Sequence, residues 1–282
     1  MERAAGENRR LTTQVGSGAD DRVAPLPPRR RDGFLANVVA PLLTIAALLV
    51  AWEAVRRVGA YPAFILPAPG AVAQRLGQVW ADGTLPRNMW VTLSEAGSGF
   101  GIALAAALAL GYALAKTPLL EVVATPLIAA SQAVPAVAIA PLLVLWLGTG
   151  IAPKVAIVAV IVFFPLLVTT IAGLRGIERS LLEVARVFGA TRWQTLWRVE
   201  LPLAAPSLLS GLKLGLTLAL TGAVVGEFVG ADSGLGYLIT WSRESAFDTS
   251  LLFAALIILM VLSTVLYGAV SILERIVLQW RD

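Results

Sequence analysis

The sequence predicts an all-α integral membrane protein, a bundle of about six transmembrane helices. Of its 282 residues, 57% are hydrophobic and 14% are charged, whereas soluble domains average roughly 45–50% apolar and about 25% charged residues. Long runs without a charged side chain recur along the chain, and a membrane-spanning helix needs about 20 predominantly apolar residues. The mean hydropathy of +0.79 agrees with this class.

The first 33 residues differ from the rest in composition. Residues 1–33 are polar, with a Pro-rich segment followed by Arg29, Arg30 and Arg31, and such a composition predicts a disordered cytoplasmic tail. No short apolar segment with a small-residue cleavage site follows the start, so a signal peptide is not expected. The arginine triplet is interpreted as a topology signal rather than a nucleic-acid patch. The transmembrane domain is therefore expected at residues 34–282.

Charge-free runs define the expected spans. The third run is too long for a simple span, and its prolines at 126, 135 and 141 predict a kinked helix followed by a turn at residues 148–150. The fifth span must extend back past Lys213, whose stem is expected to reach the inner membrane surface. The six expected spans are residues 33–52, 96–115, 122–147, 155–174, 205–226 and 249–273.

Two features outside the hydropathy pattern predict packing. Residues 53–95 are expected to form an outer segment, in which Val72, Leu76 and Val79 make a short amphipathic stretch that lies on the lipid surface. In the second span, Gly97, Gly101 and Ala105 form a ridge of small residues, and such ridges let membrane helices approach closely.

The distribution of positive charge predicts the orientation. With the N-terminus inside, 16 of the 22 Lys and Arg residues fall on the inner side, and inner loops of membrane proteins carry the excess of positive charge. We therefore expect a multi-pass plasma membrane protein with cytoplasmic N- and C-termini. The loop at residues 175–204 then lies in the cytoplasm, where ATP is found.

This loop contains the most informative stretch, Ser180–Pro202. Ser180 with Glu183 fits a capping box, and Thr191 with Gln194 fits a second one. Gly189 is expected to end the first short helix and Pro202 to end the second. The stretch therefore predicts two short helices joined by a sharp turn, with arginines among apolar side chains beside the membrane.

The same stretch resembles the EAA loop of permease subunits of type I ATP-binding-cassette importers. The family pattern is Glu-Ala-Ala, three residues, Gly, nine residues, Ile, one residue and Leu-Pro, and here Val184 and Val199 replace Ala and Ile. In the family this loop docks as a helix into a groove of the ATPase. The resemblance implies that the coupling residues are Glu183, Val184, Ala185, Arg186, Gly189, Ala190, Val199, Leu201 and Pro202.

The residue inventory limits the chemistry. The chain has no Cys and no His, which removes thiol nucleophiles, imidazole bases and the usual zinc ligands. It also lacks a GxxxxGK[ST] phosphate-binding loop, so ATP hydrolysis must come from a partner. We expect no catalytic residue, no cofactor and no metal site.

A few polar residues within the expected spans are candidates for lining a pathway. Gln132 lies in the middle of span three, and Thr217 and Thr221 recur one turn apart in span five. Hydrogen bonds between helices or to their own backbone are the alternative for these residues. Glu227 could line an outer vestibule, and the alternative is a cap or an ion pair at the outer surface.

The resemblance implies the membrane-spanning subunit of an ATP-driven importer. The implied partners are a cytoplasmic ATP-binding-cassette ATPase, an external solute-binding protein and a second permease subunit, expected to form a homodimer. The outer loop GEFVGADSGLGYLI at residues 226–239 resembles permeases for pyrimidine precursors of thiamine, with sulfonate, taurine and nitrate permeases close behind. Two alternatives remain open at this point: an ion-driven carrier or channel without an ATPase, and a carboxylate-based membrane hydrolase.

Overall fold

The computed structural model describes residues 34–279, and within them it contains helices and turns but no strand. The described residues divide into two units, with the boundary between Ala51 and Trp52. Helix α1 (Phe34–Val58) begins in the first unit and ends in the second. The expected tail at residues 1–33 lies outside the described residues.

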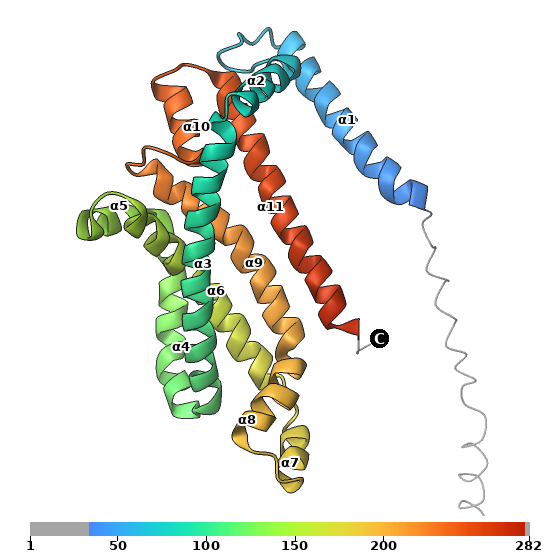
Figure 1. Cartoon of the computed structure of the whole chain (residues 1–282), viewed down its shortest axis with the longest axis vertical. Coiled ribbons are helices and arrows are strands. Elements are labelled where there is room, and N and C mark those ends of the chain that lie inside the picture. The colour runs from blue at the N-terminus through green and yellow to red at the C-terminus, as the bar shows by residue number, and fades with distance from the viewer. Residues whose placement is uncertain (1–33, 280–282) are drawn as a thin grey trace, which may run out of the picture. The chain divides into compact units, whose positions relative to one another are not determined.

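The second unit is built on four long helices (Figure 1). Together with α1 they make five helices in the described residues that are long and apolar enough to cross a membrane, or six if a bent pair counts as one span. This confirms the predicted all-α bundle of about six spans. The four helices are α3 (Thr84–Lys116), α6 (Ile151–Arg175), α9 (Leu201–Phe228) and α11 (Thr249–Val277).

The bent pair corresponds to the third expected span. Helix α4 (Pro118–Ala133) and helix α5 (Ala136–Leu147) meet at an angle of 98°, so two helices replace the single kinked helix that we predicted. The break falls at Val134 and Pro135, both in extended backbone conformations. Proline lacks the amide hydrogen that a helix needs and disfavours helical geometry in the residue before it.

The core of the second unit lies between α3, α6 and α9. Small residues on one face of α3 allow α6 to approach closely, since a Cβ atom at Gly99 would lie 2.5 Å from the Cβ of Val158. A Cβ at Gly111 would similarly lie 2.7 Å from the Thr170 methyl group. Van der Waals packing between closely approaching helices is a main driving force for helix association in a membrane. The buried members of this core are Ala96, Ala103, Ala107, Leu114, Val158, Val162, Leu166, Leu167, Ala219, Leu220 and Ala223.

The small-residue ridge that the sequence predicted is not the one that α3 uses. Gly97, Gly101 and Ala105 are exposed, and in the described part of the chain nothing lies within 4 Å of a Cβ built at Gly97 or Gly101. The packed ridge, Gly99–Ala103–Ala107–Gly111, is rotated around the helix from the predicted one. Both ridges have the same spacing, so spacing alone could not distinguish them.

The segment before α3 is shorter than expected. Helix α3 begins at Thr84, so residues 84–95 of the predicted outer segment belong to this helix. Asp82 Oδ1 accepts the backbone N–H of Thr84 at 2.9 Å, and this hydrogen bond holds the pKa of the Asp82 carboxyl group below its usual value.

A short helix, α2 (Pro69–Ala81), confirms the predicted amphipathic stretch but not its environment. Its buried residues Val72 and Val79 face the protein, and Val79 packs with Leu85 and Leu251. The chain therefore supplies the apolar surface that we had assigned to lipid. Helix α2 and helix α10 (Leu235–Glu244) lie at one end of the second unit, the α10 end, and helix α7 (Arg179–Val187) lies at the other, the α7 end (Figure 1).

Candidate functional site

The helix–turn–helix at the α7 end forms from its own sequence. Helix α7 ends at Val187, and Gly189 follows with a φ of 75°. The N–H of Gly189 donates to the carbonyl of Arg186 at 2.9 Å, and the N–H of Ala190 donates to the carbonyl of Ala185 at 3.0 Å. These two bonds define a Schellman motif, in which glycine is favoured because the left-handed conformation strains other residues. The predicted turn at Gly189 is confirmed.

The predicted start of this helix was wrong. Helix α7 begins at Arg179 with Glu178 at its N-cap, and no side chain caps it. The Ser180 hydroxyl donates instead to the Glu178 carboxylate at 2.6 Å. Ser180 is thus already inside the helix, and the pattern S-x-x-E at Ser180 and Glu183 is not a capping box.

The second capping box is present, but the helix after it does not stop at Pro202. Helix α8 (Arg192–Thr195) begins with reciprocal hydrogen bonds between Thr191 and Gln194. A π-helical turn, Leu196–Glu200, then joins it to α9, so the helical path runs on from Arg192 to Phe228. The wider turn accommodates the proline, whose ring would otherwise collide with the preceding turn of an α-helix.

The coupling loop, residues 175–204, exposes apolar side chains that a single soluble domain would bury. The exposed side chains include Val187 and Phe188 at 85% each and Trp193 at 71%. Within the described residues, α7 buries none of its own side chains. An exposed cluster of this kind marks an interaction surface.

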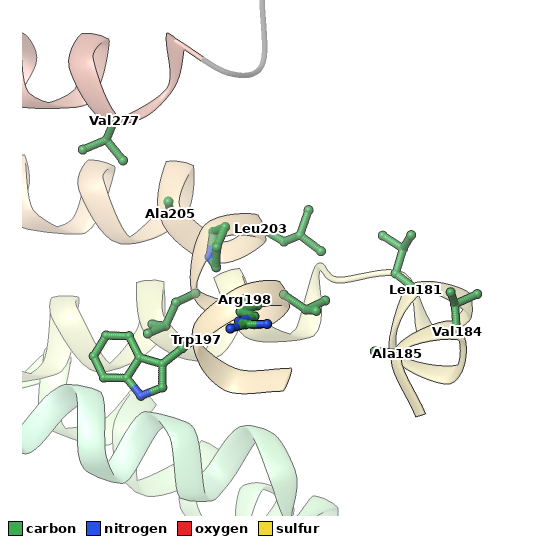
Figure 2. A pocket seen from close by; sticks show the side chains of 11 residues that line it. Leu181, Val184, Ala185, Trp197, Arg198, Leu203, Ala205 and Val277 are labelled. Carbon is green, nitrogen blue, oxygen red and sulfur yellow. The ribbon is translucent and has the colours of Figure 1, made fainter. Parts of the chain in front are cut away.

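Two hollows flank α7. The first has a volume of about 840 Å³ and lies between α7 and the start of α9, with Val277 of α11 at its edge (Figure 2). Val184, Ala185, Val199, Leu201 and Pro202 from the predicted coupling set line it. The second hollow, of about 630 Å³, lies between α7, the end of α6 and the turn between α3 and α4.

Most of the predicted coupling residues therefore divide between the two hollows. Glu183 and Arg186 face the second hollow, together with Lys116 and Arg175, whereas the apolar members face the first. Gly189 and Ala190 form the turn beyond both. Ion pairs at the base of the loop, Lys116–Glu200 and Arg175–Glu121, join it to the end of α3 and the start of α4.

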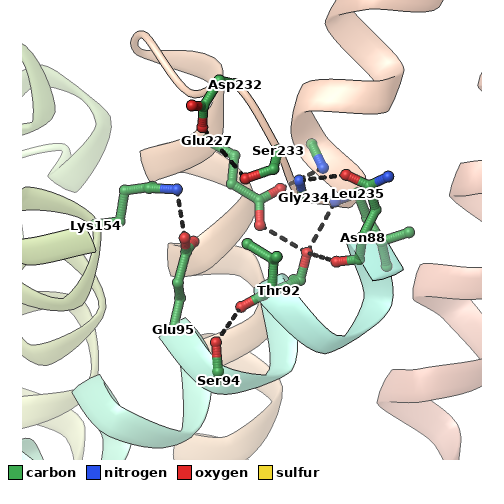
Figure 3. A network of polar contacts seen from close by, with 12 residues as sticks. Asn88, Thr92, Ser94, Glu95, Lys154, Glu227, Asp232, Ser233, Gly234 and Leu235 are labelled. Carbon is green, nitrogen blue, oxygen red and sulfur yellow. Dashed lines mark hydrogen bonds and ion pairs between the residues drawn. The ribbon is translucent and has the colours of Figure 1, made fainter. Parts of the chain in front are cut away.

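A second polar site lies inside the bundle at the α10 end (Figure 3). Glu227 of α9 is 2% exposed and accepts a hydrogen bond from the Thr92 hydroxyl of α3 at 2.6 Å. Its other oxygen accepts the backbone N–H of Gly236. Glu95 of α3 pairs with Lys154 of α6, and both are nearly fully buried. The α10 end thus holds two carboxyl groups and one ammonium group away from solvent.

The sequence did not predict this cluster. We had placed Glu95 just before span two and Lys154 just before span four, because a charge-free run excludes by definition the charged residue that ends it. Glu227 was expected in a vestibule or at the surface, and its burial corrects the surface interpretation. The glycines at 234 and 236 were the one sequence feature that could have indicated the burial of Glu227, since a Cβ at either position would collide with the Glu227 carboxylate.

The other polar candidates lie apart from this cluster, and the two threonines form hydrogen bonds within their own helix. The hydroxyl of Thr217 donates to the backbone of Lys213 at 3.1 Å, and that of Thr221 donates to the backbone of Thr217 at 3.3 Å. Gln132 lies exposed on α4. These residues do not meet Glu227 in a common site.

Lys213 has a partner that the sequence did not predict. Its ammonium group pairs with Glu274 of α11, so it links two long helices, and its reach to the inner membrane surface stays a prediction. Within residues 34–279, no three acidic side chains come together in a group that could hold a metal ion. What the chain offers is thus an exposed apolar loop at one end and a buried polar cluster at the other.

The family follows from comparison of the sequence. Residues 97–279 match the family described as binding-protein-dependent transport system inner membrane component, and the chain belongs to this family. Members are transport subunits and not enzymes, with the ATPase and the solute-binding protein as separate partners. The protein is thus a multi-pass inner membrane permease subunit for a small solute.

Curated relatives cover most of the chain. The riboflavin transport system permease protein RibX of Chloroflexus aurantiacus is 48% identical over 84% of this chain and 88% of its own. The formylaminopyrimidine transport permease protein ThiX of Halalkalibacterium halodurans is 34% identical over 87% and 97%. The taurine transport system permease protein TauC of Escherichia coli is 28% identical over 86% and 90%.

Solved structures share the fold. An inward-facing structure of the MetNI methionine ABC transporter contains a chain that superposes with a TM-score of 0.62 at 22% identity, covering 70% of this chain and 97% of that one. An amino acid ABC transporter gives a TM-score of 0.58 at 17% identity, covering 71% and 97%. At these identities the likeness supports the fold alone.

Proposed function

We propose that this permease subunit couples ATP hydrolysis to solute import through the loop around Gly189. The observation that carries the proposal is the Schellman turn, which presents α7 and its exposed apolar side chains beyond the long helices. An amphipathic helix with an unpartnered apolar face fits a groove on another protein. The residues that would contact the ATPase are the coupling residues predicted from the sequence.

The mechanism uses the continuity of the helix after the turn. ATP binding brings the two ATPases together, and each moves the coupling loop that it holds. Helix α8 continues without interruption into α9, so movement of the loop repositions the core of the bundle and exposes the pathway to alternate sides. Two copies of the chain form the complete pathway in this proposal, with both termini of each in the cytoplasm.

The relatives favour a planar nitrogen heterocycle as the solute. RibX and ThiX are 48% and 34% identical to this chain, and their names specify riboflavin and formylaminopyrimidine. The aliphatic sulfonate permease SsuC of Bacillus subtilis, at 30%, and the taurine permease, at 28%, are less identical to this chain. We therefore place riboflavin and thiamine pyrimidine precursors ahead of sulfonates and nitrate. Mass spectrometry of the molecule that co-purifies with the cognate binding protein tests this, and a sulfonate in that position would overturn it.

The coupling role is tested by Gly189→Val in proteoliposomes that contain the permease, its ATPase and its binding protein. Valine at a φ of 75° costs about 1–2 kcal/mol in backbone strain, which reshapes the turn and leaves the long helices folded. We expect solute uptake to fall about tenfold or more, in the range of a disturbed protein interface, while the purified chain remains abundant and folded.

Gly83→Val is the matched control, because Gly83 has a φ of 80° but lies between α2 and α3 at the α10 end. At both glycines, the described part of the chain has nothing within 4 Å of a new Cβ, so both variants carry a similar strain. Uptake that falls equally in both would remove the specific role of the loop. Gradient-driven uptake by the purified chain without ATPase would favour the ion-driven carrier instead.

A further inference from the structure

The turn that precedes α10 is held by side chains from two long helices. We propose that Thr92, Asn88 and Glu227 are positioning residues for transport, which seat the N-terminus of α10 in the bundle and thereby shape the surface at which solute enters. None of the three needs to touch the solute in this role. The proposal goes beyond the coupling function and depends on it only for its transport measurement.

Asn88, Thr92 and Glu227, together called the seat, accept hydrogen bonds from backbone groups of the turn before α10. Asn88 Oδ1 accepts the N–H of Gly234 at 2.6 Å, and Thr92 Oγ1 accepts the N–H of Leu235 at 2.8 Å. The next N–H, that of Gly236, donates to Glu227. Three successive backbone donors that a helix start leaves without partners are thus satisfied by three side chains.

Thr92 connects the two halves of the seat. Its hydroxyl donates to Glu227 Oε1 at 2.6 Å while its oxygen accepts from Leu235, and Thr92 itself is fully buried. A methyl group in place of this hydroxyl can neither donate nor accept, so loss of the hydroxyl would remove the hydrogen bond between α3 and α9 and one of the three bonds to the turn.

The backbone of the turn is adapted to the carboxylate. Gly234 has a φ of 118°, and a Cβ on it would overlap the carboxyl group of Glu227. A Cβ on Gly236 would lie 2.8 Å from Glu227 Oε2 and 2.9 Å from the carbonyl of Val224. The turn therefore approaches α9 as closely as glycine allows, and a carboxylate near a helix N-terminus is electrostatically favourable.

The ion pair beside the seat fixes the face of α3 that carries it. Asn88, Thr92 and Glu95 lie four and three residues apart, on one side of the helix. Glu95 is held by Lys154 of α6, so α3 is kept in the rotation that directs Thr92 toward Glu227. The three long core helices all contribute to the seating of α10.

Helix α10 itself contributes apolar contacts and a buried reporter position. Leu235 and Leu238 pack with Leu85 and Leu251, and Ser242 near the end of the helix is 0% exposed. The Ser242 hydroxyl donates only to the carbonyl of Ile239 in its own helix among the described residues. A cysteine at 242 would therefore be hidden while α10 is seated and reactive when it is displaced.

The test uses the absence of cysteine from the chain. The full-length Ser242→Cys protein, purified in detergent, is treated with a maleimide, alone and combined with Thr92→Val or Thr92→Ser. Valine matches threonine in shape but lacks the hydroxyl, whereas serine retains it. We expect Thr92→Val to raise the labelling rate by about tenfold or more, since a buried group loses its partner, and Thr92→Ser to leave the rate close to that of the Ser242→Cys protein.

Ala103→Cys in the core of α3, 1% exposed, is the control for general unfolding. Labelling at 242 that does not respond to Thr92→Val would overturn the proposal, and so would equal labelling at 103 and 242. In the reconstituted transporter we expect Thr92→Val to reduce uptake and Thr92→Ser to restore it. Reduced uptake with an unchanged labelling rate would indicate direct solute contact and would also overturn it. The labelling needs no ATPase or solute, so it stands if the proposed coupling fails.

Discussion

At the scale of single residues, the buried ion pair between Glu95 and Lys154 bears directly on stability. The side chains are 1% and 7% exposed, and Glu95 Oε2 has no hydrogen-bond partner among residues 34–279. The lysine is therefore the main compensation for the Glu95 charge. Ionisable groups inside membrane spans are costly unless they are paired.

Lys154→Met tests this compensation. The substitution leaves the Glu95 charge buried without its partner, which costs about 3–5 kcal/mol in comparable cases. We expect a clearly lower melting temperature of the detergent-purified chain, measured by intrinsic tryptophan fluorescence. The double variant Lys154→Met with Glu95→Gln removes both charges and should recover most of the loss. If the double variant were no more stable than the single one, the ion pair would not be the reason.

Hydropathy located the spans but not the chemistry at their ends. Six apolar regions and the turn at Gly189 followed from composition and local backbone preference. The cluster of Glu95, Lys154 and Glu227 did not, because it depends on which faces of three distant helices meet. Local patterns also gave wrong predictions at Ser180 and Pro202. Helix α7 begins at Arg179 rather than after Ser180, and a π-turn before Pro202 lets the helix continue through the proline.

At the scale of elements, α3 carries two ridges of small residues, and the structure assigns different environments to them. Gly99 lies against α6, with a new Cβ placed 2.5 Å from Val158. Gly97 is exposed on another face of the same helix. The sequence alone does not show which ridge packs against another helix, since the small residues of both ridges repeat every four residues.

Gly99→Val and Gly97→Val separate the two ridges. We expect Gly99→Val to destabilise the purified chain by about 1–3 kcal/mol, the usual cost of overpacking, and Gly97→Val to change stability by less than about 0.5 kcal/mol. Denaturation in mixed micelles of detergent and sodium dodecyl sulfate measures both. Equal destabilisation would mean that the face of α3 carrying Gly97 is also packed within one chain.

At the scale of the whole molecule, the two functional ends lie at opposite ends of the long helices (Figure 1). The excess of Lys and Arg in the segments joined to the α7 end predicts that this end faces the cytoplasm. The turn between α10 and α11 then faces outward. This orientation is what allows one end to meet an ATPase and the other to meet a solute-binding protein.

Single cysteines in the cysteine-free chain test the orientation. Phe247 and Val187 are 81% and 85% exposed, one at each end of the second unit. We expect Phe247→Cys to react with an impermeant maleimide in cells whose outer membrane, where present, has been made permeable. Val187→Cys should react only after the inner membrane is opened. The reverse pattern would invert the topology and remove the coupling loop from the side that contains ATP.

The uninterrupted helical path from Arg192 to Phe228 spans 37 residues, or roughly 55 Å at about 1.5 Å per residue. Its first residues belong to the loop that would meet the ATPase, and Glu227, one residue before its end, holds the turn of α10. In such a helix, a tilt applied at one end displaces the other end directly, because the backbone hydrogen bonds keep the helix in one piece. Movement of the coupling loop and the position of the α10 turn would then be connected by one continuous helix, and the π-turn at Leu196–Glu200 is the point where that helix departs from α-helical geometry.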